Sequence, residues 1–359
     1  MTASTAPANK AATAARGVVS TDNNFNALRL IFALMVAAYH VVVLPWRASG
    51  TPAEDALAAM AEIGVQGFFI LSGYLVYASL ERSSSLALYA EKRIRRLYPG
   101  YATVVIACAL AALAASPEAR ASLDKVAAYL GWNLVFLNFM APDLPGVFGA
   151  NRFSEVNGAL WTLKIEVMFY LVLPLLAVLL RAAGRQKWLV LVLLYAGAEA
   201  WRIGLEEMGR TQGSELLVQA ARQLPGQMSF FVTGIAFHMI RLDTRRLQLA
   251  GLAGLGVFVL SLLTPLAEPL RAVGLGALAI YLGAGVARTA DAARFGDLSY
   301  GLYIVHFPII QTVIAAGLFA SPWIGVGVSA AASLAAALLL WHLVERPALR
   351  TDSAYRKHA

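Results

Sequence analysis

The sequence predicts an all-α membrane protein, a polytopic bundle of about ten transmembrane helices, and two observations predict it. Of the 359 residues, 59% are hydrophobic and only 14% are charged, whereas an ordinary soluble domain is about 25% charged. The apolar residues also come in blocks of roughly 17 to 22, the length at which a helix crosses a hydrocarbon core about 30 Å thick. Because a backbone in lipid must pair its own polar groups and strand alternation is nowhere sustained, the blocks are predicted to be helices.

Ten blocks are long enough to span the membrane. They are 27–45, 62–80, 98–115, 159–180, 188–204, 224–240, 248–264, 271–287, 298–319 and 323–344. Lys and Arg are enriched in the short loops that lie on the cytoplasmic side of a membrane. The loops rich in Lys and Arg are 81–97, 181–187, 241–246 and the tail from Arg346 to Lys357. All of them face inward only if the further apolar stretch 126–141 is a re-entrant or interfacial segment, and ten crossings then leave both termini in the cytoplasm.

The two ends of the chain are predicted to lie outside the membrane domain, which covers 27–345. Residues 1–26 are rich in Ala and Thr, lack the apolar core of a secretory signal and are expected to form a disordered cytoplasmic tail. Residues 346–359 are expected to form a basic cytoplasmic tail. The net charge of +8 is largely explained by the inward-facing loops, so no nucleic-acid partner is expected. The single cysteine, Cys108, excludes an intrachain disulfide, and no metal site is predicted.

The first helix contains RLIFALMVAAYH, residues 29–40. Arg29 and His40 are eleven residues apart, so they project from one face and are separated by about 16 Å along the axis. Arg29 could simply anchor the helix at the cytoplasmic interface. A histidine deep in the membrane is expensive on a lipid-facing surface, so His40 is predicted to face the bundle interior or water and is a site candidate.

The second helix contains GVQGFFILSGYLVY, residues 64–77, in which three glycines favour close helix packing and Ser72 supplies a hydroxyl. It leads into YAEKRIRRLYPGY, residues 89–101, where Arg93 and Arg96 share a face if this segment is helical. Two interpretations stay open. The segment is an ordinary positive-inside loop, or its guanidinium groups form an anion site that binds phosphate.

The fourth crossing opens with NGALWTLKIEVMFYLVLPLL, residues 157–176, where Glu166 and Tyr170 share a face one turn apart. A carboxylate in hydrocarbon costs several kcal/mol unless it is paired, protonated or hydrated. A salt bridge to Lys164 or to another helix is the structural alternative to a functional role for Glu166.

Near the carboxyl end, FGDLSYGLYIVHFPI (295–309) places Ser299, Tyr303 and His306 on one stripe, again with a deep histidine. In WHLVERP (341–347), Glu345 and Arg346 are most simply an ion pair at the inner end of the last helix.

These stretches together resemble the acyltransferase-3 family of integral membrane proteins, which O-acylate cell-surface glycans and some small molecules. The resemblance spans nearly the whole chain. It rests on the Arg, ten residues and His of the first helix, on GFFILSGY followed by Arg-x-x-Arg, on WTLKIEVMFYL with Trp161 and Glu166, and on LSYGLYIVHFP. Members often carry a second acidic residue after the first, whereas Val167 follows Glu166 here, so a two-acid mechanism is not expected.

The resemblance implies an enzyme that takes an acyl group, most simply acetyl, from cytoplasmic acyl-CoA and delivers it to a hydroxyl of a surface glycan or its lipid-linked precursor. His40 matches the essential histidine of the family, Arg29 its partner in that motif, and Arg93 and Arg96 the arginine pair. A multi-pass position in the cell inner (plasma) membrane is expected. So are carbohydrate and lipid contacts, no permanently bound cofactor, and separate polysaccharide-assembly proteins as possible partners.

The residue chemistry supports the same reaction. Acyl transfer to an alcohol needs a base, oxyanion stabilisation and a donor clamp. Neutral imidazole nominates His40 as base or acyl relay, and the two arginines could hold CoA phosphates. His306 is a second relay or a hydrogen-bond donor. Ser72, Trp161, Tyr170 and Tyr303 are possible substrate or relay residues.

Two other classes remain open. In a transporter or flippase, the same intramembrane residues would line a path for a glycan or another polar substrate, but the matching halves typical of transporters are not found. In a sensor or scaffold they would serve packing alone.

Overall fold

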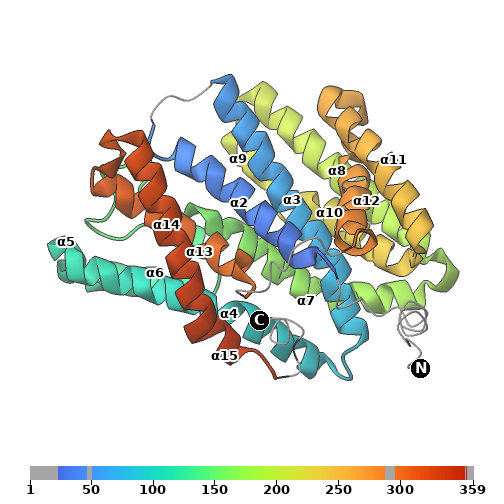
Figure 1. Cartoon of the computed structure of the whole chain (residues 1–359), viewed down its shortest axis with the longest axis horizontal. Helices are drawn as coiled ribbons and strands as arrows, with labels where there is room; N and C mark the ends of the chain where they lie inside the picture. Colours follow the sequence, from blue (N-terminus) through green and yellow to red (C-terminus); the bar gives the residue numbers. More distant parts are fainter. Residues whose placement is uncertain (1–22, 47–50, 288–295, 352, 354–359) are drawn as a thin grey trace, which may run out of the picture. The chain divides into compact units, whose positions relative to one another are not determined.

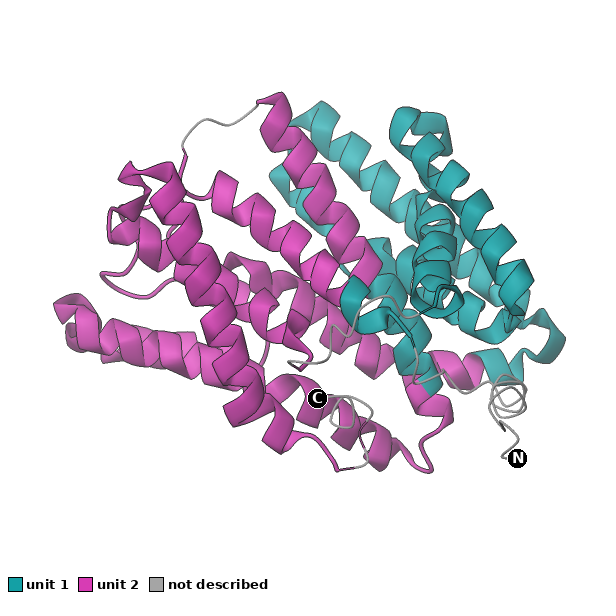
Figure 2. Cartoon of the chain, viewed as in Figure 1, with its two compact units in different colours: residues 1–28, 69–78, 180–292 teal, residues 29–68, 79–179, 293–359 magenta. Residues whose placement is uncertain are grey.

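The computed structural model of the chain describes residues 23–46, 51–287, 296–351 and 353. Most of the predicted tail 1–26, and residues 354–359 of the other tail, lie outside this part. The described residues form helices and no strands, as the sequence predicts (Figure 1). The chain splits into two compact units (Figure 2), with residues 1–28, 69–78 and 180–292 in unit 1 and residues 29–68, 79–179 and 293–359 in unit 2.

The helices that match the predicted crossings are longer than expected at several ends. They are α2 (Phe25–Val43), α3 (Pro52–Glu81), α4 (Leu86–Ala115), α7 (Trp161–Ala182), α8 (Lys187–Gln212), α10 (Leu224–Ile240), α11 (Thr244–Leu263), α12 (Arg271–Ile280), α13 (Leu298–Ala315) and α14 (Pro322–Leu340). Short π-helical turns extend α12 through Tyr281–Gly285 and α14 through Trp341–Glu345. Shorter helices are α5 (Pro117–Ala121), α6 (Leu123–Leu134), α9 (Glu215–Ala221) and α15 (Arg346–Ala348).

Nine helices in the described ranges are long and apolar enough to cross a membrane. The tenth predicted crossing, 224–240, is the 17-residue helix α10, about 25 Å long. The stretch 126–141 overlaps α6, whose 12 residues span about 18 Å. That length is too short for a hydrocarbon core of about 30 Å, which agrees with the interpretation of 126–141 as a segment that does not cross.

The arginine-rich stretch 81–97 is not a loop, which corrects the boundary expected at residue 98. The helix α4 begins at Leu86 and runs for 30 residues, so Arg93 and Arg96 lie within its first turns. Ser85 starts this helix, because its side chain accepts a hydrogen bond from the backbone N–H of Leu88 at 3.1 Å. A serine in this position satisfies one of the free donors of a helix start, a signal that was present in the sequence.

Unit 1 is built from α8, α10, α11, α12 and the residues 69–78 of α3 (Figure 2). The segment of α3 touches α10 through glycines on both sides. A Cβ placed on Gly73 would lie 2.0 Å from the carbonyl oxygen of Phe231, and one on Gly234 would lie 2.1 Å from that of Ile70. No side chain fits there, so the close packing expected from the second-helix glycines is found at Gly73.

Unit 2 is centred on α13, most of whose side chains are buried. Phe32 of α2 fits over Gly67 of α3, where an added Cβ would meet the phenyl ring at 2.4 Å. The start of α7 and the helices α2 and α4 contribute polar side chains that contact α13 or the residue before it. Unit 2 therefore holds all of the predicted site residues except Ser72.

Two prolines inside helices of unit 2 free a backbone carbonyl, and a side chain bonds each of them. Proline has no N–H to donate to the carbonyl four residues earlier. Pro174 of α7 leaves the carbonyl of Tyr170, which accepts from the Tyr89 hydroxyl at 3.0 Å. Pro308 of α13 leaves the carbonyl of Ile304, which accepts from Asn157 Nδ2 at 2.8 Å. These bonds meet the requirement that backbone groups at membrane depth be satisfied.

Candidate functional site

The two deep histidines of unit 2 meet. His40 Nδ1 of α2 lies 2.9 Å from His306 Nε2 of α13. His306 is fully buried, and its Nδ1 lies 3.1 Å from the carbonyl oxygen of Leu302 one turn earlier. His40 is only half-buried. The sequence predicted that each histidine would avoid lipid but did not pair them, because the partners are 266 residues apart.

Aromatic rings hold this histidine pair. The rings of Phe307 and His40 form a T-shaped pair with centroids 5.2 Å apart, and those of Tyr303 and His306 form another at 5.9 Å. The Tyr303 hydroxyl hydrogen-bonds with Thr162 Oγ1 at 2.6 Å. This bond ties the start of α7 to α13. Trp161, the first residue of α7, is half-buried beside Thr162.

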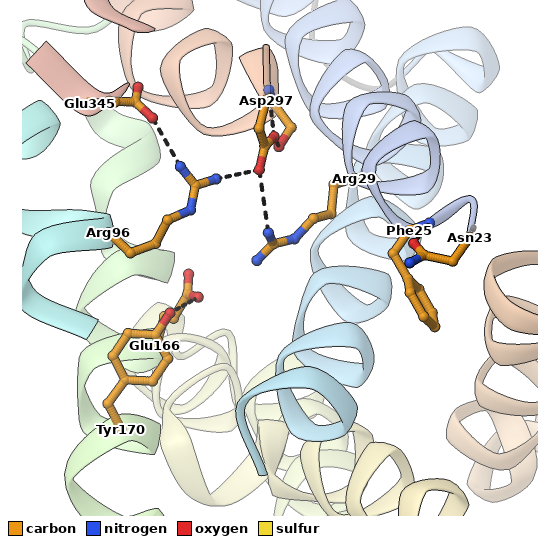
Figure 3. A network of polar contacts seen from close by, with 9 residues as sticks. Asn23, Phe25, Arg29, Arg96, Glu166, Tyr170, Asp297 and Glu345 are labelled. Carbon is orange, nitrogen blue, oxygen red and sulfur yellow. Dashed lines mark hydrogen bonds and ion pairs between the residues drawn. The ribbon is translucent and has the colours of Figure 1, made fainter. Parts of the chain in front are cut away.

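A buried network of four charged groups lies at the amino-terminal end of α13. Arg96 Nη2 binds Asp297 Oδ2 at 2.6 Å, and Arg96 Nη1 binds Glu345 Oε2 at 3.0 Å. Arg29 Nη1 lies 3.5 Å from the same oxygen of Asp297 (Figure 3). All four side chains are buried, and each lies within ion-pair distance of an opposite charge in the network.

Asp297 organises the start of α13. Its Oδ1 accepts from the hydroxyl of Ser299 at 2.6 Å and from the Ser299 backbone N–H at 3.4 Å, as an N-cap residue does. Burial raises the pKa of the Asp297 carboxyl, but the charges of Arg96 and Arg29 and the bonds from Ser299 bring it below its ordinary value of 3.8. The resulting stabilisation is present above that value and is lost as pH falls through the lower pKa of the folded protein.

The arginine pair of α4 is divided between two sets of partners. Arg96 is engaged by two carboxylates. Arg93 is half-buried, donates from Nη2 to Ser79 Oγ at 3.3 Å and lies over the ring of Tyr170 at 5.7 Å. The hydroxyl of Tyr170 donates to Glu166 Oε1 at 2.5 Å. Arg93, Tyr170 and Glu166 thus form a second polar chain, whose last two members Figure 3 shows.

The predicted residues also include three whose surroundings differ from expectation. Lys164, offered as an ion partner of Glu166, lies over the ring of Phe139 at 4.8 Å. Glu345, expected to pair with the adjacent Arg346, binds Arg96. Ser72 lies in unit 1, buried, and its Oγ has no hydrogen-bond partner in the part of the chain that the structure describes.

Sequence reasoning missed Asp297, Thr162 and Glu345 as members of the polar networks. An acidic residue directly before an apolar helix is a capping signal, and it could have drawn attention to Asp297. Nothing local indicates that Glu345 meets Arg96, because 249 residues separate them. Among the described residues, no group of three or more His, Cys, Asp or Glu side chains is arranged to hold a metal ion.

The arrangement offers a histidine with part of its surface accessible, a second histidine that contacts it, and an arginine not bound to a carboxylate in the contacts above. Neutral imidazole takes up a proton near physiological pH, and a guanidinium binds phosphate with two parallel hydrogen bonds. Unit 2 therefore carries groups suited to proton transfer and to anion binding.

Comparisons with known proteins give the chain its relatives. Residues 22–342 match the model of the acyltransferase-3 family, described as an acyltransferase domain. The chain is 27% identical to nodulation protein 10 of Rhizobium leguminosarum bv. viciae, covering 93% of this chain and 96% of that protein. It is 25% identical to an O-acetyl transferase of Shigella phage Sf6, with 92% and 97% covered.

A partial similarity links the chain to a further protein. It is 28% identical to the peptidoglycan O-acetyltransferase OatA of Listeria monocytogenes, over 48% of this chain and 27% of that protein. No solved structure matches the chain.

Proposed function

The chain belongs to the acyltransferase-3 family, and on this premise we propose that it moves an acyl group, acetyl in the simplest case, from cytoplasmic acyl-CoA to a hydroxyl of a surface glycan or its lipid-linked precursor. The observation that carries the proposal is the contact of the half-buried His40 with His306 at 2.9 Å. It equips the first helix with a base whose ring is held by a neighbour.

The reaction needs one proton to move twice. His40 removes the proton of the acceptor hydroxyl while the hydroxyl oxygen bonds to the thioester carbonyl carbon. The carbon–sulfur bond then breaks, and the CoA thiolate takes the proton back from the imidazolium of His40. The products are the ester and free CoA. An acyl-imidazole on His40 is the alternative route, with the same overall balance.

Arg93 is the better placed of the two arginines to contact the CoA phosphates. Its Nη2 donates to the Ser79 hydroxyl, and its buried Nε has no hydrogen-bond partner among the described residues. Arg96 already binds two carboxylates, and moving it to a phosphate would leave Asp297 and Glu345 buried with less compensation. In this proposal Arg96 and Arg29 hold the helices around the site, and Glu166 contacts the acceptor sugar or orients a neighbouring group.

The names of the relatives support acetyl and a carbohydrate. One is an O-acetyl transferase and another a peptidoglycan O-acetyltransferase. We place the protein in the inner (plasma) membrane as a multi-pass enzyme, with its acyl donor inside and its acceptor at the outer face. Polysaccharide-assembly proteins are candidate partners for delivery of the acceptor.

The test uses purified full-length protein in detergent or liposomes with radiolabelled acetyl-CoA, with and without extracted surface glycan. We expect label to reach the glycan, and we expect His40→Ala to abolish transfer, a loss of about 10² to 10⁴. His342→Gln is the matched control, because His342 is exposed and lies outside the site. Glycan movement into liposomes without dependence on acyl-CoA would instead indicate a transporter, and full activity of His40→Ala would overturn the assigned base.

A further inference from the structure

We propose that His306 is a positioning residue that sets the tautomer of His40, so that His40 Nε2 is the nitrogen that takes the proton of the acceptor. This inference rests on the proposed function, because it assigns an atom to the base of that reaction. It also assigns His306 a task different from the relay or donor roles expected from the sequence, since His306 acts here as a hydrogen-bond acceptor.

The assignment follows from the fixed end of the hydrogen-bond chain. The carbonyl oxygen of Leu302 can only accept, so His306 Nδ1, at 3.1 Å, must carry a proton. In a neutral imidazole the other nitrogen is then bare. His306 Nε2 is therefore an acceptor, and His40 Nδ1, at 2.9 Å, must be the donor to it. Neutral His40 is left with an unprotonated Nε2.

The residues around the two histidines keep these hydrogen bonds in the same arrangement. His306 is 1% exposed, so its ring cannot exchange the Leu302 carbonyl for water. Tyr303 packs edge-on against it and is itself held by Thr162. The His40 ring also hydrogen-bonds with the backbone of Val36, one turn earlier on α2, and His40 is half-buried. The nitrogen that this chain of bonds leaves without a proton therefore belongs to a residue that is not fully buried.

The same hydrogen bonds determine how His40 behaves once it has taken up the acceptor proton. When His40 Nε2 gains the acceptor proton, Nδ1 keeps its own and continues to donate to His306 Nε2. The bond then has an ionised donor and becomes stronger. His306 takes up no proton. The acceptor proton remains on His40 and returns to the leaving thiolate. The arrangement resembles in logic the orientation of a catalytic histidine by a neighbouring acceptor, with imidazole in the place of a carboxylate.

Two amide substitutions of His306 test whether His40 needs a hydrogen-bond acceptor at the position of His306 Nε2. In His306→Gln, the amide oxygen of the longer side chain reaches the place of Nε2 and can accept from His40. In His306→Asn, the shorter amide reaches only the place of Nδ1, beside Leu302. We expect kcat within about tenfold of wild type for Gln and a loss on the order of 10² for Asn, with KM for acetyl-CoA nearly unchanged in both.

A tautomer measurement provides a readout independent of turnover. The chain has five histidines, so selective ¹⁵N-histidine labelling gives an assignable spectrum, with His40→Gln and His306→Gln identifying the two signals. We expect both residues in the Nδ1–H form in the wild type, and His40 to shift toward Nε2–H in His306→Asn. His342→Gln should alter neither signal.

The outcomes distinguish this inference from the proposed function. If no label reaches the glycan with the wild-type protein, the proposed function fails, and if His40→Ala keeps full activity, the assigned base is wrong. If His40→Ala is inactive while Asn and Gln at position 306 behave alike, or if wild-type His40 carries its proton on Nε2, the role of His306 is wrong and the acyl transfer stands. A kcat recovered by Gln but not by Asn, together with the Nδ1–H signal, supports both.

Discussion

Arg93 and Arg96 lie three residues apart on α4, yet their surroundings give them different tasks. Arg96 is buried and bound by Asp297 and Glu345, whereas Arg93 is half-buried and contacts a hydroxyl and an aromatic ring. Removing one partner from a buried ion pair leaves the other charge uncompensated, which is more costly than losing an exposed pair. Stability should therefore depend on the Arg96 network and donor binding on Arg93.

Asp297→Asn should lower the stability of the folded protein by about 3 to 5 kcal/mol, because both Arg96 and Arg29 lose a buried counter-charge. The measurement is the thermal unfolding midpoint in detergent. Glu207→Gln is the control. It makes the same carboxyl-to-amide change beside Arg210, but both side chains of that pair are largely exposed, so no measurable shift is expected. Equal shifts in the two variants would contradict the assigned role of the network.

Arg93→Gln should impair binding of acyl-CoA, whereas Arg96→Gln should lower the stability of the folded protein. We expect Arg93→Gln to raise KM for acyl-CoA about tenfold while the unfolding midpoint stays near that of wild type, since a single charge-assisted bond to a phosphate is removed. Arg96→Gln should lower the midpoint, because the buried carboxylates of Asp297 and Glu345 each lose an ion pair. Steady-state kinetics and thermal unfolding on the same preparations check both. A higher KM in Arg96→Gln with unchanged stability would reverse the assignment.

At the scale of elements, helices α7 and α13 each carry an interior proline whose missing hydrogen bond is replaced from another element. Tyr89 of α4 bonds the carbonyl freed by Pro174, and Asn157 bonds the one freed by Pro308. A proline inside a helix is ordinarily destabilising. Here each freed carbonyl bonds a side chain of another segment of unit 2. The carbonyl freed by Pro308 bonds Asn157, which lies four residues before the start of α7.

Tyr89→Phe should cost about 1 to 2 kcal/mol, because it leaves the carbonyl of Tyr170 without a donor. In a Pro174→Ala background the backbone N–H of residue 174 returns, and the same change should then cost much less. A double-mutant cycle of unfolding free energies measures the coupling, expected to be about 1 kcal/mol. The second cycle, Asn157→Ala with Pro308→Ala, should behave likewise. Additive effects in both cycles would show that the carbonyls are satisfied in another way.

At the scale of the whole molecule, two contacts fix the relative direction of α2 and α13. Arg29 meets Asp297 at one end and His40 meets His306 farther along both helices, so the two run in the same direction. As the first and ninth of the ten predicted crossings, they are expected to do so. If 126–141 were a crossing they would be opposed. The contacts of unit 2 therefore agree with the number of crossings that the positive loops indicated.

Labelling of single cysteines in intact cells tests the predicted topology. In a Cys108→Ala background, Gln186→Cys lies in the arginine-rich loop and should react with a membrane-impermeant maleimide only after permeabilisation. Ser321→Cys, between α13 and α14, should react in intact cells. Ala12→Cys in the amino-terminal tail should behave like Gln186→Cys. Reaction of Gln186→Cys in intact cells would contradict this topology, because it would require an odd number of crossings before residue 186 in place of the four that are predicted.

The sequence was sufficient for the class of fold and for most helices, because block length and composition dominate in lipid. It failed at the boundary of α4, where a charged amphipathic start looks like a loop. For the site, helical spacing placed Arg29 and His40 on one face and Ser299, Tyr303 and His306 on another. It could not join the two histidines, or Arg96 to Glu345, because those contacts depend on how distant helices pack.

The side-chain bonds to the carbonyls freed by Pro174 and Pro308 have a consequence for the evolution of the family. A chain that acquired Pro308 before Asn157 would have held a bare carbonyl at membrane depth, whereas a spare amide near an already bonded carbonyl costs little. We therefore expect the asparagine to have been in place before Pro308, and the tyrosine before Pro174. Homologues should accordingly include many with the donor and an ordinary residue in place of the proline, and very few with the proline alone.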